Sequence, residues 1–181
     1  MAKSELGENA SELSHWRNIV VPQRYTTGCV PTGYEWLFRY LGIEGVELGT
    51  FQEDFDLQRI GRGMNSFVPV ADSIKLRYPF VDIRIESFGQ GFEKVRAIRN
   101  LIARDIPCLI SLSLQGYRTH EGLTIDRGWH IMPTVFVSDQ KMIMIHRGTE
   151  SGNELLERRT ATIIQRHNDL EGGKDISWIE V

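Results

Sequence analysis

Cys29 is the residue of this chain that is best placed for covalent chemistry. It lies where a loop that follows Gln23 runs into segment 30–41, whose apolar residues recur at helical spacing. A thiol at the start of a helix is close to backbone N–H groups and to the positive end of the helix dipole. Both favour the thiolate, which is the nucleophilic form. The sequence therefore predicts a reactive thiol, although an isolated cysteine is more often a small buried hydrophobe.

Two histidines are placed to assist such a thiol. His130 and His146 are 16 positions apart, at the outer ends of segments 129–137 and 141–146, which a short turn at 138–140 separates. The pattern predicts a β-hairpin, and antiparallel pairing would bring the two imidazoles together at its open end. A nucleophilic cysteine needs a base, and the base benefits from a third group that orients it. We expect Cys29, His130 and His146 to fill these three positions, although a histidine such as His130 is, taken alone, more often a structural strand residue, and the structural interpretation of His146 has about equal weight.

Gln23 supplies a possible fourth group. It precedes Cys29 by six positions, so its amide could point at a developing oxyanion beside the backbone N–H of Cys29. The alternative is that it only bridges its own loop. Cys108 follows Pro107 in an apolar segment and is interpreted as structural. Because the chain has no His-x3-His or Cys-x2-Cys spacing and no glycine-rich phosphate loop, we expect neither a metal nor a cofactor.

The elements that must position these residues alternate along the chain. Helical spacing starts after Cys29 and ends at Gly42, with Pro31 suited to the first turn. Further helices are predicted over 68–78, 92–102 and 154–167, and further strands over 80–85, 106–114 and 176–181. The pattern indicates one α+β unit over residues 19–181, preceded by a peripheral leader over residues 1–18.

Composition limits the partners. The chain has 181 residues and a formal net charge of −3, from 21 basic and 24 acidic residues, with no basic block. This argues against nucleic acid as a partner. The polar N-terminus and the lack of an 18-residue apolar run predict no membrane insertion and a cytoplasmic location. With only two cysteines, we expect free thiols rather than a disulfide.

Taken together, these residues resemble the papain-like cysteine peptidases. The similarity is carried by Gln23, by the Cys-x-Pro-Thr start of the helix at Cys29, by the Ile-Pro-Cys-Leu-Ile segment 106–110 and by Gly-Trp-His at 128–130. It runs from Pro22 to His146 and is nearest to the compact group of bacteriocin-leader-processing (double-glycine) peptidases. The family usually has Asp or Asn where this chain has His146, and a small residue where it has Val30.

The resemblance implies a papain-like fold in which the helix with the nucleophile packs on an antiparallel sheet. It also implies hydrolysis of an amide, in a peptide or protein substrate, through a thioacyl-enzyme. Cys29 would be the nucleophile, His130 the general base and acid, and Gln23 the oxyanion-hole residue. Two alternatives stay open: acyl transfer to an amine by the same residues, and a papain-like fold that has lost turnover and serves as a peptide-binding or scaffold module.

Overall fold

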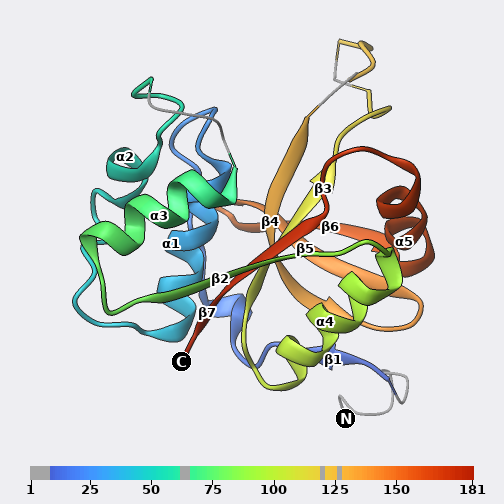
Figure 1. Cartoon of the computed structure of the whole chain (residues 1–181), viewed down its shortest axis with the longest axis horizontal. Helices are drawn as coiled ribbons and strands as arrows, with labels where there is room; N and C mark the ends of the chain where they lie inside the picture. The colour runs from blue at the N-terminus through green and yellow to red at the C-terminus, as the bar shows by residue number, and fades with distance from the viewer. Residues whose placement is uncertain (1–8, 62–65, 119–120, 126–127) are drawn as a thin grey trace.

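The computed structural model describes residues 9–61, 66–118, 121–125 and 128–181. In the described residues one antiparallel sheet runs in the order β2-β7-β3-β4-β5-β6, and β1 pairs with β4 (Figure 1). The strands are β1 (Ser11–Glu12), β2 (Asp82–Ser87), β3 (Cys108–Ser113), β4 (Trp129–Val137), β5 (Lys141–Thr149), β6 (Gly152–Arg159) and β7 (Asp175–Glu180). The helices are η1 (Trp16–Asn18), α1 (Cys29–Leu41), α2 (Phe51–Phe55), α3 (Phe67–Arg77), α4 (Gly91–Ala103) and α5 (Thr160–Asp169). The predicted α+β class is confirmed.

Helix α1 packs against one face of the sheet. Gly33 approaches β3 so closely that an added Cβ would lie 3.0 Å from Leu109, and the Tyr34 hydroxyl is 2.7 Å from Ser177 Oγ on β7. Directly opposite residues of an antiparallel pair share a face, so Pro133, which pairs with Leu109, faces α1 as well. In Figure 1 helices α4 and α5 lie together, away from the group formed by α1, α2 and α3.

The bounds of α1 follow from its sequence. Its last turn ends at Gly42, which adopts the left-handed conformation (φ 64°) and whose N–H donates to the Phe38 carbonyl. Nearly every side chain of α1 is buried, including Glu35, which pairs with Arg39 at 2.8 Å. The predicted helix is confirmed, and Cys29 is its first residue.

Most of the other predicted elements are also found. Helices α3 and α4 and strands β3 and β7 match their predicted segments within two or three residues, and β2 begins two residues later than expected. Strands β4 and β5 form the predicted hairpin. Within the described residues, no helix combines the length and the apolar character that crossing a membrane requires.

The helix predicted over 154–167 is wrong in its first half. Residues 152–159 instead form β6, where Leu155 pairs with Ile145 and Leu156 pairs with Met144. The true helix, α5, starts only at Thr160. Pairing with the edge of the hairpin outweighs the helix propensity of Glu and Leu, which is worth only a few tenths of a kcal/mol per residue.

The peripheral leader expected over residues 1–18 is wrong for its described part, residues 9–18. Leu13 is only 2% exposed and Trp16 is also buried. Strand β1 pairs with the end of β4, and the Ser14 N–H donates to the Asp105 carboxylate at 2.9 Å. The segment is thus part of the packed unit, because β4 offers it a strand edge and a hydrophobic surface that its own sequence does not reveal.

Candidate functional site

Cys29 stands at the start of α1, directly after a tight turn. The Gly28 N–H donates to the Tyr25 carbonyl at 3.0 Å, and a Cβ on Gly28 would lie 3.1 Å from the same oxygen. The side chain of Cys29 is mostly buried, with 9% of the residue exposed. Cys29 and Cys108 are not joined by a disulfide. The placement predicted for the thiol, in the field of the helix N-terminus, is therefore found.

A cavity lies beside the thiol, between α1, the loop before it and strands β4 and β5. Three of the four residues singled out from the sequence line it: Cys29, Gln23 and His146. The other lining residues are mainly apolar: Val21, Thr32, Gly33, Trp36, Ile131, Pro133, Ile145, Arg147 and Gly148. The fold thus brings Cys29, Gln23 and His146 to the lining of one cavity.

His130 does not line this cavity. It pairs with Leu112 of β3, and Leu112 lines a different cavity on the other face of the sheet. The next residue, Ile131, faces Cys29, and successive side chains of a strand point to opposite faces. His130 contacts His146 instead: their ring centroids are 5.0 Å apart, at 68°. The predicted meeting of the two imidazoles is confirmed, and the role of His130 as general base stays a prediction.

A bulge in β5 explains how His146 reaches the cavity. The register between β5 and β6 shifts between Ile145 and Arg147, so His146 has no direct partner in the pairing. Such an irregularity re-aims a side chain. It accounts for four successive residues, from Ile145 to Gly148, lining one cavity.

The His130 ring is held in a defined protonation state. Burial lowers the pKa of His130, and this outweighs the hydrogen bond to the His146 carbonyl, which raises it. Burial thus favours the neutral form of the imidazole. Its Nε2 lies 3.2 Å from the His146 carbonyl oxygen, which can only accept, so Nε2 carries the proton and Nδ1 is the acceptor.

The Gln23 side chain is directed into its own loop. Its Nε2 donates to the carbonyls of Tyr25 at 2.7 Å and Thr26 at 3.3 Å. Two carbonyl acceptors identify this atom as the amide nitrogen, and both of its hydrogens are used. The bond to Thr26 is long and weak. An oxyanion role for Gln23 therefore stays a prediction, and it would require the amide to leave that bond.

A residue that the sequence analysis missed holds this loop in place. Gln52, 1% exposed, donates from Nε2 to the Pro22 carbonyl and to Glu35 Oε2, both at 2.9 Å. Its Oε1 accepts from the Arg24 N–H at 2.8 Å and from Thr32 Oγ1 at 2.9 Å. Gln52 thus ties both neighbours of Gln23 to α1. No motif marks it, because it lies in a short helix far from Cys29 in the sequence.

A second missed residue, Asp56, lies under the turn that leads to Cys29. It is buried and accepts the Thr27 hydroxyl on both carboxylate oxygens, at 2.9 and 3.1 Å. It also accepts the Arg59 N–H at 3.1 Å. These bonds fix Thr27, two residues before the thiol, and so define the approach of the chain to α1.

The other wall of the cavity depends on a close backbone contact. Pro22 forms an isolated parallel bridge with Gly148 of β5, and a Cβ on Gly148 would lie 2.6 Å from the Val21 backbone. Only glycine permits this approach without displacement of the loop. Asn153 adds a hydrogen bond to the Ile19 carbonyl at 2.9 Å. Within the described residues, no cluster of three or more His, Cys, Asp or Glu could hold a metal ion.

Comparison with known proteins finds similarity to solved structures, at the level of the fold. No protein-family model matches this chain, and no curated protein matches it. Among solved structures 12 chains match. One is the crystal structure of a candidate C39-like peptidase from Bacillus anthracis, with a TM-score of 0.53 and 12% sequence identity, over 94% of this chain and 98% of that one. At this identity the likeness shows the fold alone, that of a C39-like peptidase.

Proposed function

We propose that this protein is a cysteine-dependent hydrolase that cleaves an amide bond of a peptide or protein substrate. One observation carries the proposal: Cys29, at the first position of α1, lines a single cavity with His146 and Gln23. The likeness of the fold to a C39-like peptidase supports the same reaction class by analogy.

In the proposed reaction the Cys29 thiolate attacks the carbonyl carbon of the amide, and a tetrahedral intermediate forms with its negative charge on the carbonyl oxygen. That oxyanion lies at the start of α1, where the helix dipole and backbone N–H groups favour negative charge. The C–N bond then breaks, an imidazolium gives its proton to the leaving amine, and a thioacyl-enzyme remains. Water, deprotonated by the same imidazole, attacks the thioester and releases the acid with the thiol.

The two imidazoles have different roles in the proposed reaction. The resemblance assigns the general base to His130, whereas the cavity supports His146, because His146 lines it together with the thiol. We therefore assign proton transfer to His146. His130 acts as a positioning residue, since its Nε2–H binds the His146 carbonyl at 3.2 Å and holds the backbone of the β5 bulge.

The test measures the rate of Cys29 alkylation against pH in the full chain, together with hydrolysis of a mixed peptide library followed by mass spectrometry. The proposal expects fast labelling well below pH 8 and cleavage products that disappear in Cys29→Ser. An ordinary thiol profile with no cleavage, in a folded protein, would overturn it.

A second candidate function rests on the Gln23 contacts. Because both amide hydrogens of Gln23 are bonded to its own loop, and most of the cavity wall is apolar, the chain is also consistent with a peptide-binding module without turnover. This candidate expects library peptides to be retained uncleaved by wild type and by Cys29→Ser alike.

A further inference from the structure

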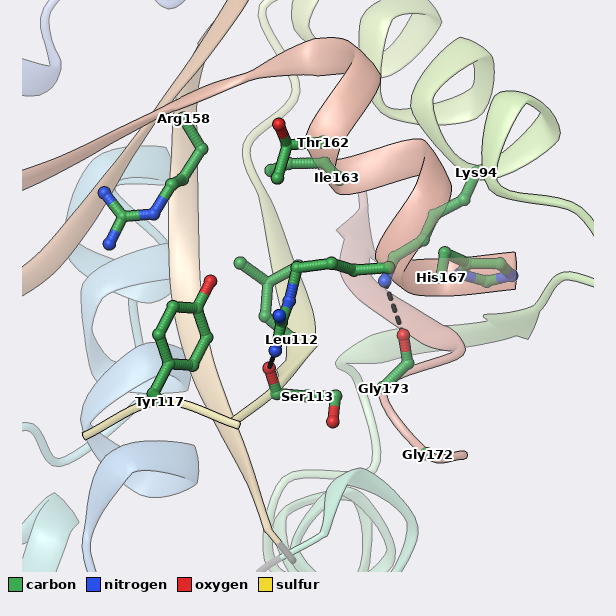
Figure 2. A pocket seen from close by; sticks show the side chains of 11 residues that line it. Lys94, Leu112, Ser113, Tyr117, Arg158, Thr162, Ile163, His167, Gly172 and Gly173 are labelled. Carbon is green, nitrogen blue, oxygen red and sulfur yellow. Dashed lines mark hydrogen bonds between the residues drawn. The ribbon is translucent and has the colours of Figure 1, made fainter. Parts of the chain in front are cut away.

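A second cavity lies on the opposite side of the sheet from Cys29. Figure 2 shows Arg158 and Tyr117 on one side of it and Lys94, His167 and the Gly172–Gly173 turn on the other. Its basic lining residues are Lys94 from α4, Arg158 from β6 and Arg166 from α5. Among the described residues, none of those that line the cavity has a carboxylate. Three basic residues therefore line one cavity without a lining carboxylate.

Lys94 is the most unusual of the three. It is 0% exposed, and its ammonium donates to the carbonyls of Ser111 at 2.6 Å and Gly173 at 2.7 Å. These contacts use two of its three donors. In the part of the chain that the structure describes, no carboxylate lies within 4.0 Å of Nζ. Burial lowers the pKa of Lys94 to about 7, although the charge of Asp175 acts in the opposite direction.

The guanidinium groups of both arginines lie over the aromatic ring of Tyr117. The Arg166 guanidinium lies 4.3 Å from the Tyr117 ring centroid, and Nη2 donates to the Gln115 carbonyl at 2.6 Å. The Arg158 guanidinium lies 5.9 Å from the same ring. A guanidinium carries five N–H donors in a planar fork that suits the oxygens of a phosphate or carboxylate. Stacking on Tyr117 restricts the two arginine side chains before a ligand arrives, so they lose less conformational entropy when it binds.

His167 adds an acceptor to the same cavity. It is 4% exposed, and its Nε2 lies 2.9 Å from the Phe88 carbonyl, so Nε2 carries the proton. Its Nδ1 is buried and has no hydrogen-bond partner among the described residues. A buried unsatisfied acceptor calls for a donor, and the P–OH group of hydrogen phosphate is one.

We propose that this cavity binds a phosphate-type oxyanion, held by the Lys94 ammonium and the guanidinium groups of Arg158 and Arg166. Two guanidinium groups and the Lys94 amine, which a bound anion would keep protonated, match a dianion better than a monoanionic carboxylate, because no lining residue is an acid. The imidazole acceptor matches the remaining proton of the dianion. The site lies away from the Cys29 cavity and shares no lining residue with it. The proposed phosphate site therefore does not depend on the proposed hydrolase activity.

The test measures binding of inorganic phosphate to the full chain by thermal unfolding, with chloride used to keep ionic strength constant. The expected result is a saturable rise of Tm with phosphate, because a ligand that binds only the folded state stabilises it by mass action. Arg158→Gln should raise the dissociation constant for phosphate about tenfold or more, as expected for loss of a charge-assisted hydrogen bond. Arg158 is suited to this because, among the described residues, its guanidinium donates only to the carbonyl of the adjacent Glu157, so its loss removes no long-range hydrogen bond.

Arg159→Gln is the matched control. Arg159 is the exposed neighbour of Arg158 on β6 and does not line the cavity, so its removal changes the net charge equally and should leave phosphate binding within about twofold of wild type. Equal phosphate responses in Arg158→Gln and wild type, or a rise in Tm without saturation, would refute the site. A parallel titration with glycerol 2-phosphate distinguishes the source: tighter binding of the ester identifies a phosphoryl group on an organic ligand, and tighter binding of phosphate identifies the free ion.

Discussion

The ring centroids of His130 and His146 lie 5.0 Å apart, and His130 Nε2 is 3.2 Å from the His146 carbonyl oxygen. Only His146 lines the Cys29 cavity. The contact between the two residues is therefore unequal: His146 lines the cavity beside the thiol, and His130 binds the His146 backbone carbonyl.

This arrangement predicts different effects for the two histidines on the thiol. His146→Ala should abolish fast alkylation of Cys29 at pH 6 to 7, and His130→Ala should slow it by a smaller factor, on the order of tenfold. Iodoacetamide labelling with peptide mapping measures both. Cys108 is the internal control: burial raises its pKa to about 12, so it should stay unlabelled in the folded protein. A larger loss in His130→Ala than in His146→Ala would show that the assignment is reversed.

The lowered pKa of His130 predicts a pH-dependent stability. Because burial depresses the pKa in the folded state, the unfolded chain binds the proton more readily below about pH 6.5. The contribution to stability is therefore present above pH 6.5 and is lost as pH falls through the folded-state pKa. Urea unfolding of wild type and His130→Gln between pH 7.5 and 5 checks this. The free energy of unfolding should fall less steeply in the variant, and parallel curves would contradict the prediction.

The lowered pKa of Lys94 also predicts a free energy of unfolding that rises with pH, but in a different pH range. Its pKa falls from 10.5 to about 7 on folding, so between these values the unfolded state holds one more proton than the native state. The free energy of unfolding should rise with pH there, by up to about 1.4 kcal/mol per pH unit. Urea unfolding between pH 7 and 9.5 should show this slope in wild type and lose it in Lys94→Met. Lys75→Met, at an exposed lysine of α3, should keep the wild-type slope.

Gln52 is predicted to be essential for the loop before the thiol. Gln52→Ala leaves the Arg24 N–H, the Thr32 hydroxyl and the Pro22 carbonyl without their buried partner. We expect destabilisation of about 2–4 kcal/mol and slower Cys29 labelling at pH 7. The control is Gln58→Ala, an exposed glutamine on the same segment, which should stay within about 0.5 kcal/mol of wild type. Chemical denaturation together with the labelling assay separates loss of stability from loss of the site.

Gly148 is predicted to set the width of the Cys29 cavity. An added methyl group would lie 2.6 Å from the Val21 backbone, so Gly148→Ala must move the loop that carries Gln23. The expected cost is about 1–3 kcal/mol, with faster access of a bulky maleimide to Cys29 as the loop separates from β5. Gly89→Ala, where an added methyl group meets nothing within 4 Å, is the matched control. Unchanged stability and labelling in Gly148→Ala would show that the loop does not depend on this contact.

The sequence by itself determined the elements whose signals are local. Helical spacing between Cys29 and Gly42 defines α1, because the apolar stripe and the glycine stop are set by neighbours three and four residues apart. The short turn between β4 and β5 likewise defines the hairpin, and with it the meeting of His130 and His146. These features needed no knowledge of distant segments.

Only the tertiary structure decided which side chains face the thiol. The bulge at His146 arises in the pairing of β5 with β6, a strand that the sequence pattern presented as helix. The burial of Leu13 and Trp16, and the four hydrogen bonds of Gln52, depend on segments far away in the chain. The physical reason is that a one-residue change of register moves a strand side chain to the other face of the sheet. That choice is made by long-range packing, and local periodicity does not record it.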